Sequence, residues 1–180
     1  MSADWSKLEI IHYPDPRLRQ RCEPVTEFDA DLAALAKRML ELMRAHNGVG
    51  LAAAQVGVPL RLFVMNTTED AANDKVFANP ELLDLTGAKE SEEGCLSLPE
   101  VRVQVRRAQR GKLRAQDLKG QTVEIEADDL TARVWQHEID HLNGVLIIDR
   151  MGPSDKIATK KLLRELELEF EELKKRGKKK

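Results

Sequence analysis

The sequence predicts an α+β fold in which antiparallel strands surround one buried central helix, and two patterns carry this prediction. In residues 101–106 valines alternate with polar side chains, and residues 112–117 and 121–127 form two further strand-like segments joined by a turn at 118–120. Such alternation with short turns is typical of antiparallel hairpins. Residues 128–144 instead carry apolar side chains on two sides of a helical wheel, which is typical of a helix in the interior.

Composition limits the classes of protein to which the chain can belong. Its 180 residues, 42% of them hydrophobic, suffice for one domain with its own core. The formal net charge of -2 argues against a domain that binds nucleic acid over its whole surface, and we expect no specific DNA partner. Two cysteines suit a reducing compartment, and no apolar run is long enough for a membrane span or a signal peptide. We therefore expect a cytoplasmic protein with no membrane partner.

The first half of the chain predicts a helix, a segment of small residues and a strand. Residues 29–46 carry an apolar stripe at helical spacing. Residues 48–57 are mostly small, so another molecule could approach their backbone closely, although taken alone this run is more typical of a tight packing corner. A buried strand is predicted over residues 60–66, after which Asn79-Pro80 and Thr86-Gly87 separate two short segments.

Two histidines on the central helix predict a metal site. His137 and His141 are one helical turn apart, so both imidazoles can reach one ion. Glu138 flanks that point and could accept a proton from a metal-bound water without being a ligand itself. A cap at Asp128 or Asp129 would begin this helix. The alternative interpretation is a pair of hydrogen-bonded core histidines beside a surface glutamate.

A third protein ligand is needed, because catalytic centres of this kind use three protein ligands and a water. One common continuation places a histidine where this chain has Ile147. The charged C-terminal segment offers three alternatives, Glu165, Glu167 and Glu169. Cys95 is the better candidate, because Gly94 and Pro99 place it in a turn-like segment that could direct its sulfur. Ligand chemistry alone would favour zinc, which suits one thiolate and two imidazoles.

The C-terminal segment predicts a helix followed by a basic tip. Apolar residues between 157 and 173 fit a helical stripe that a cap at residues 154–155 would begin, although residues 165–171 also alternate like a strand. We expect one domain over residues 1–173. Residues 174–180 would form a basic, frayed tip, which is either a solvated helix end or a docking surface for RNA or another acidic partner, the ribosome included.

Three motifs together make the chain resemble the peptide deformylase family. They occur in the family's order and at similar separations, and they read Gly48-Val49-Gly50-Leu51-Ala52-Ala53-Ala54-Gln55, Glu93-Gly94-Cys95-Leu96-Ser97 and Gln136-His137-Glu138-Ile139-Asp140-His141. The opening segment His12-Tyr13-Pro14-Asp15-Pro16-Arg17-Leu18 is also similar, and the terminal helix resembles that of the common bacterial type. The resemblance covers most of the chain. It implies hydrolysis of the N-formyl group from the formylmethionine of newly synthesised polypeptides, with release of formate.

The resemblance also implies roles at the catalytic centre. The metal ligands would be Cys95, His137 and His141. The family typically uses Fe(II), tolerates Ni(II) or Co(II) and is much less active with Zn(II), so we expect one Fe(II) ion per chain. Glu138 would accept and later deliver the proton. The side-chain amide of Gln55 and the backbone N–H of Leu96 would stabilise the oxyanion.

The substrate contacts follow from the same resemblance. An extended formylmethionyl peptide would pair with the backbone of Gly48, Val49 and Gly50. The methionine pocket would be lined by Val49, Leu130, Arg133 and Val134. Arg133 departs from the apolar residue often found at its position, which puts an unexpected charge beside the pocket.

Two other functions fit parts of the sequence. A zinc endopeptidase would take its third ligand from the C-terminal glutamates and would not need Cys95. A structural metal module, or a ribosome-associated one, would use the basic tip and would not need Glu138. Neither alternative explains the small residues of 48–57 or the segment around Cys95.

Overall fold

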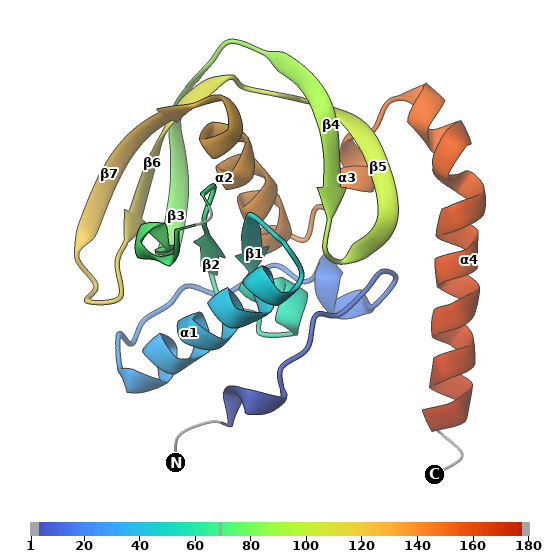
Figure 1. Cartoon of the computed structure of the whole chain (residues 1–180), viewed down its shortest axis with the longest axis horizontal. Helices are drawn as coiled ribbons and strands as arrows, with labels where there is room; N and C mark the ends of the chain where they lie inside the picture. The colour runs from blue at the N-terminus through green and yellow to red at the C-terminus, as the bar shows by residue number, and fades with distance from the viewer. Residues whose placement is uncertain (1–3, 69, 178–180) are drawn as a thin grey trace.

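The computed structural model describes residues 4–68 and 70–177 and confirms an α+β architecture. Helix α2 (Asp129–Leu142) lies in the middle of the molecule, between a five-stranded sheet and a separate two-stranded hairpin (Figure 1). Helix α1 (Ala30–Ala45) packs against the short end of the five-stranded sheet, and the long helix α4 (Pro153–Gly177) stands on the far side of the hairpin. No helix within the described ranges is long and apolar enough to cross a membrane.

The larger sheet is antiparallel throughout, with the order β1-β2-β3-β6-β7. Its strands are β1 (Gly50–Ala52), β2 (Leu62–Met65), β3 (Lys75–Thr86), β6 (Arg110–Gln116) and β7 (Thr122–Asp128). The strand expected over residues 60–66 and the hairpin expected around the turn at 118–120 are therefore confirmed. Because β1 lies at the sheet edge, one side of its backbone is not paired within this sheet.

The second sheet is a hairpin of β4 (Lys89–Cys95) and β5 (Leu98–Arg107). The predicted alternation in β5 is confirmed, since its valines are buried and the residues between them are exposed. The partner strand β4 was not predicted, because its sequence is acidic and lacks β-branched residues. Its glutamate Glu93 is nevertheless buried, since it pairs with the buried Arg107 of β5.

Strand β3 continues through Asn79-Pro80, where the sequence predicted a break. The register shifts between Ala78 and Glu81, and Asn79 adopts a φ of 50°, so the strand bends there without ending. The Asn79 side chain accepts a hydrogen bond from the backbone N–H of Val25 (2.8 Å) and donates one to its carbonyl oxygen (2.9 Å). These two hydrogen bonds connect the bend of β3 to the segment around Val25.

The predicted helices are present, but two of the predicted capping hydrogen bonds do not form. Asp29 does cap α1, by accepting a hydrogen bond from the backbone N–H of Leu32 (2.9 Å). Asp128 occupies the N-cap position of α2 without a capping hydrogen bond, while the Asp129 carboxylate pairs with Lys89 (2.8 Å). Short helical segments complete the chain: η1 (Trp5–Lys7), η2 (Pro16–Arg19), η3 (Ala53–Val56), η4 (Ala71–Asn73) and α3 (Ile147–Arg150).

Helix α4 confirms the helical alternative for the C-terminal segment. Asp155 does not cap it, since its carboxylate accepts a hydrogen bond from the backbone N–H of Gln104 in β5 (2.7 Å) and so ties the helix to the hairpin. The helix extends through Gly177, so residues 174–177 of the predicted tip are helical. Basic side chains in a last helical turn interact favourably with the helix dipole. Residues 178–180 of the predicted tip lie outside the described residues.

The core consists of three apolar clusters, of which one contains residues of the central helix. One lies between α1 and strands β1 and β2, a second between the larger sheet and α2, and a third between β5, α3 and α4. Trp135 of α2 and Phe63 of β2 are almost completely buried in the second cluster. Burying side chains of this size favours folding by about 1.5–3 kcal/mol each. The helix that carries both histidines is therefore fixed against the larger sheet.

Candidate active site

Three metal-binding side chains meet between α2 and the end of β4. His137 and His141 come from α2 and Cys95 from the last residue of β4, and their ligand atoms lie within 4.8 Å of one another. The Nε2 atom of His141 is 3.2 Å from both the Sγ of Cys95 and the Nε2 of His137. One thiolate and two imidazole nitrogens that converge in this way form a suitable donor set for a single divalent ion.

Glu93 orients the first of these histidines. The Nδ1 of His137 donates to Glu93 Oε2 (3.1 Å), which leaves Nε2 directed at the other two ligand atoms. Burial opposes a charge on Glu93, but hydrogen bonds from Arg107 and His137 outweigh it and hold its pKa well below the ordinary value. A carboxylate on the second nitrogen fixes the imidazole tautomer that a metal requires. The surroundings of His137 thus fit a ligand role.

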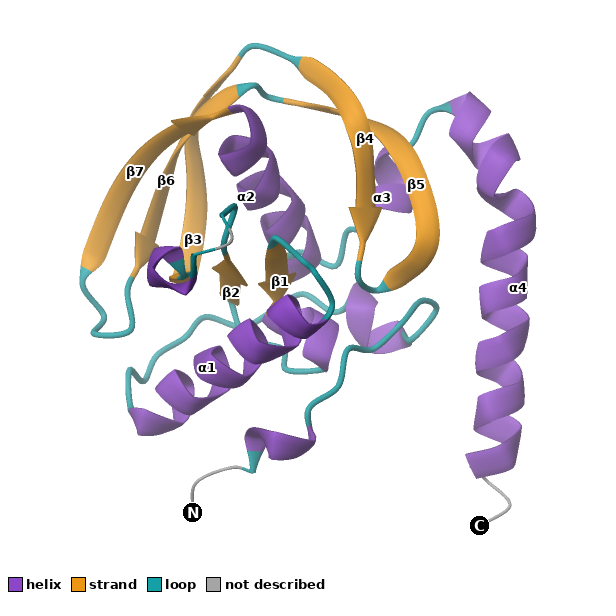
Figure 2. Ribbon diagram, in the orientation of Figure 1, coloured by secondary structure: helices purple, strands orange, loops and turns teal. Residues whose placement is uncertain are grey.

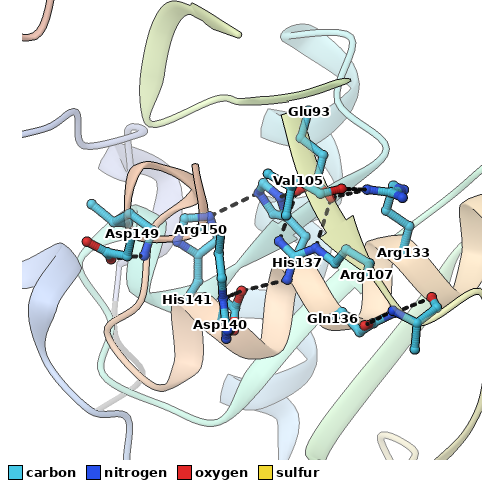
Figure 3. Close-up of polar contacts among 12 residues, drawn as sticks. Glu93, Val105, Arg107, Arg133, Gln136, His137, Asp140, His141, Asp149 and Arg150 are labelled. Atoms are coloured by element: carbon cyan, nitrogen blue, oxygen red, sulfur yellow. Dashed lines mark hydrogen bonds and ion pairs between the residues drawn. The ribbon is translucent and has the colours of Figure 1, made fainter. Parts of the chain in front are cut away.

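The surroundings of His141 differ from those of His137. Burial lowers its pKa well below the ordinary range, so its ring is neutral, as a metal ligand must be. Within the described part of the chain its Nδ1 is buried without a hydrogen-bond partner. Its neighbour Asp140 bridges the Arg107 guanidinium (2.6 Å) and the Arg150 guanidinium (2.6 Å), as Figure 3 shows. This chain of ion pairs ties α2 to β5 and to α3.

Glu138 lies next to the ligands but is not one of the cluster. Its side chain is almost fully buried against the backbone of Gly50, and its Oε2 has no hydrogen-bond partner among the described residues. Burial raises the pKa of this carboxyl to about 7. A carboxyl group that changes protonation near neutral pH is suited to accept and return a proton.

Gln55 of η3 also lies beside the metal-binding side chains. Its Oε1 accepts a hydrogen bond from the backbone N–H of Ala52 (2.8 Å), which leaves the amide nitrogen free to point toward the ligands. Nε2 lies 3.5 Å from Cys95 Sγ and donates to the Oγ of Ser97 (3.2 Å). Ser97 was not assigned a role from the sequence, although it lies in the segment around Cys95, because only the folded contact shows what it orients.

A cavity of about 710 Å³ opens beside these groups. Figure 2 shows the loop before β1 close to the turn between β4 and β5, and both contribute to the cavity wall. It is lined by every site residue predicted from the sequence except His141, which is buried behind His137: Gly48, Val49, Gly50, Gln55, Cys95, Leu96, Leu130, Arg133, Val134, His137 and Glu138. The tertiary structure therefore brings the whole predicted set together.

The residues that sequence reasoning missed belong to the layer behind the ligands. Glu93 and Asp140 were quoted within motifs but received no role, and Arg107 was not considered. They are buried and mutually paired, and a sequence pattern signals such pairs only weakly because the partners lie far apart in the chain. In the described residues the only ligand cluster contains Cys95 and the two histidines, so the C-terminal glutamates offer no third ligand.

Comparison with known sequences identifies the family. The sequence model of the polypeptide deformylase family matches residues 7–157. The peptide deformylase of Thermotoga maritima is 47% identical over 156 residues, which cover 86% of this chain and 93% of that protein. The peptide deformylase of Acidobacterium capsulatum is 46% identical over 145 residues, covering 79% of this chain and 85% of that protein.

Comparison with solved structures agrees with the sequences. The crystal structure of the Thermotoga maritima peptide deformylase has a TM-score of 0.77 at 46% identity and covers 81% of this chain and 98% of that one. A peptide deformylase from Legionella pneumophila has a TM-score of 0.83 at 40% identity, with 94% and 98% covered. The chain therefore belongs to the polypeptide deformylase family, the metal-dependent hydrolases that remove the N-formyl group from newly synthesised polypeptides and release formate.

Proposed function

We propose that this deformylase works through one divalent ion held by Cys95, His137 and His141, with Glu138 as its general base. The observation that carries the proposal is the convergence of the three ligand atoms within 4.8 Å at the wall of the cavity. Bound there, a divalent ion would lower the pKa of a water and polarise the formyl carbonyl. The side chains around it transfer the proton, stabilise the developing charge and bind the substrate.

Glu138 moves the proton. Its carboxylate accepts a proton from the attacking water and then delivers it to the amine that leaves. Two features support this role, namely its position beside His137 and the burial that raises its pKa to about 7. The backbone of Gly50, packed against the carboxylate, holds it at the bottom of the cavity.

Gln55 and Leu96 stabilise the charge that develops on the formyl oxygen. The Gln55 amide is fixed in advance by Ala52 and Ser97, so its nitrogen needs no reorientation when the charge appears. The backbone N–H of Leu96 comes from the turn that directly follows Cys95. Donors placed in this way favour the transition state over the bound substrate.

The substrate peptide binds along the edge of the larger sheet. An extended chain pairs with the backbone of Gly48, Val49 and Gly50, as a peptide commonly does at an exposed strand edge. The methionine side chain enters the part of the cavity formed by Leu130, Arg133 and Val134 of α2 and by Val49.

We assign Fe(II) as the resident ion, on the resemblance to the family, with Ni(II), Co(II) or Zn(II) as substitutes. The donor set itself, one thiolate and two imidazoles, suits all four ions. Metal analysis of protein purified without oxygen tests the assignment directly. Iron at one equivalent per chain is expected, and zinc at one equivalent with full activity would contradict it.

We also propose that the protein works in the cytoplasm and docks on the ribosome through the basic end of α4. Support comes from the cations gathered in the last described turns, Lys174, Lys175 and Arg176. Cosedimentation with ribosomes at increasing salt tests the docking, because contacts with phosphates weaken steeply as salt rises. Replacement of the three cations by glutamine should abolish it. Unchanged cosedimentation would sink this part of the proposal.

The central experiment measures formate release from a formylmethionyl peptide by metal-loaded enzyme, with an acetylmethionyl peptide as the comparison substrate. In Glu138→Gln the shape is kept but the base is lost, so turnover should fall at least about 100-fold while the ion stays bound. Glu90→Gln, an exposed change on β4, is the matched control. Retained turnover in the Glu138 variant with metal present would mean that another group is the base.

A further inference from the structure

Arg133 is a charged and mostly buried residue of the proposed methionine pocket. It lies on α2 between Leu130 and Val134, both of which line the same cavity. Its side chain is only 11% exposed. A charged group buried to this extent costs stability unless it is paired and hydrogen-bonded.

The Arg133 guanidinium is bound by the hairpin of β4 and β5. Nη1 donates to Glu93 Oε1 (2.6 Å) and to the backbone oxygen of Val105 (3.1 Å), and Nη2 donates to the backbone oxygen of Lys89 (2.9 Å). Figure 3 shows Arg133 extended beside Glu93 and Val105. The charge is therefore satisfied by β4 and β5, and the methylene groups of the side chain remain to cover the pocket wall.

Glu93 is the point at which this contact reaches the metal site. Its Oε1 accepts hydrogen bonds from Arg133 Nη1 and from Arg107 Nε (2.8 Å). Its Oε2 accepts from Arg107 Nη2 (2.9 Å) and from His137 Nδ1 (3.1 Å). Arg133 and His137 thus bind opposite oxygens of one carboxylate, so Glu93 connects the two side chains.

We propose that Arg133 is a positioning residue that links the methionine pocket to the metal centre. Its guanidinium fixes Glu93, and Glu93 in turn fixes the His137 ring for the ion. Its aliphatic stem forms one wall of the pocket that receives the methionine side chain. The charge that was unexpected beside the pocket is therefore paired with Glu93 and acts through it on the metal ligand His137.

Substitutions can separate these two roles. Arg133→Met keeps an unbranched apolar stem of similar length but removes the guanidinium, whereas Arg133→Ala removes both. Arg133→Lys keeps the charge without the fork that reaches Glu93 and two carbonyl oxygens at once. Arg106→Met, an exposed arginine of the same hairpin, is the matched control.

The test uses enzyme loaded with Co(II) and has three readouts. They are the rate of Co(II) transfer to a chelator, the visible absorption of the bound ion, and KM and kcat for a formylmethionyl peptide. For Arg133→Met we expect release to be about 10-fold faster or more, since outer contacts of a ligand contribute about that much to metal affinity. Its absorption bands should shift, and its KM should stay within about two-fold. Arg133→Lys should release the ion at an intermediate rate.

Arg133→Ala should release the ion as fast as Arg133→Met and should in addition raise KM about 10-fold, because a wall of the pocket is missing. The inference is overturned if Arg133→Met releases Co(II) at the rate of the unchanged protein with unchanged bands, or if the alanine variant has no higher KM than the methionine variant. Should the methionine variant not fold, Arg133→Lys decides, and release at the unchanged rate overturns the inference.

The inference rests on the proposed metal site, and the readouts keep the two apart. Failure of the unchanged protein to release formate would defeat the proposed function, whereas the rate of Co(II) release and the absorption bands do not depend on turnover. Thermal unfolding of each metal-loaded variant reports separately on stability. A fall in melting temperature without faster release would make Arg133 merely structural and would also overturn the proposal.

Discussion

Gly50 of β1 and Glu138 of α2 are in direct contact at the bottom of the cavity. A Cβ atom added at Gly50 would overlap the Glu138 carboxylate and would lie only 2.8 Å from its Cδ. The glycine is therefore needed for space and not for backbone freedom. The contact also joins the edge strand, along which the substrate is proposed to lie, to the proposed general base.

Gly50→Ala tests this contact. The new methyl group should displace the Glu138 carboxylate by about 1 Å and lower kcat about 100-fold, because catalysis is sensitive to misplacement of this size. Metal content should not change, since the ligands are not touched. Gly152→Ala is the control, because a Cβ atom there has no neighbour within 4 Å. An unchanged kcat in Gly50→Ala would show that the position of Glu138 is not critical.

Gln55→Leu tests the oxyanion role. Leucine keeps the volume but removes the amide, so kcat should fall about 100- to 1,000-fold with a much smaller change in KM. Steady-state formate release over a range of substrate concentrations measures both constants. A change in KM alone would mean that Gln55 only binds the substrate.

Arg107→Met tests the ion pairs behind the ligands. Arg107 pairs with Glu93 and Asp140, and its side chain is only 4% exposed. Its loss leaves two buried carboxylates short of a partner and should reduce the free energy of unfolding by about 3–5 kcal/mol. Urea denaturation of metal-saturated protein measures this change. The neighbouring exposed Arg106→Met should cost less than about 0.5 kcal/mol, and equal losses in the two variants would contradict the special role of Arg107.

The thiolate ligand leads to a prediction about oxygen. With Fe(II) bound beside Cys95, activity should decay in air, because both the iron and the sulfur can be oxidised. The Ni(II) and Zn(II) forms should be stable in air, with poor turnover for zinc. Activity against time for the three forms, with mass spectrometry of the peptide that contains Cys95, makes the comparison. An iron form as stable as the nickel form, or a zinc form that is the most active, would refute the iron assignment.

Local patterns were sufficient to predict several main elements, including the helix that carries the two histidines. The spacing of His137 and His141, the apolar stripe of α1 and the alternation in β5 each depend on neighbours within a few residues, and each is confirmed as a helix or strand. The resemblance of three short motifs then identified the family and a set of residues that line one cavity. What the amino-acid sequence determined by itself was the type of most main elements and the three side chains that meet at the candidate metal site.

The tertiary structure decided which contacts hold these side chains in place. The acidic segment of β4 is a strand in which Glu93 forms an ion pair with Arg107 of β5. At the start of helix α4, Asp155 accepts a hydrogen bond from β5 and does not form the predicted cap. Likewise, the Arg133 guanidinium is bound by Glu93 and by two backbone oxygens of the hairpin. In each case a polar side chain binds a partner that is distant in the sequence. Its energy depends on burial and pairing across the fold, and no pattern of neighbouring residues contains that information.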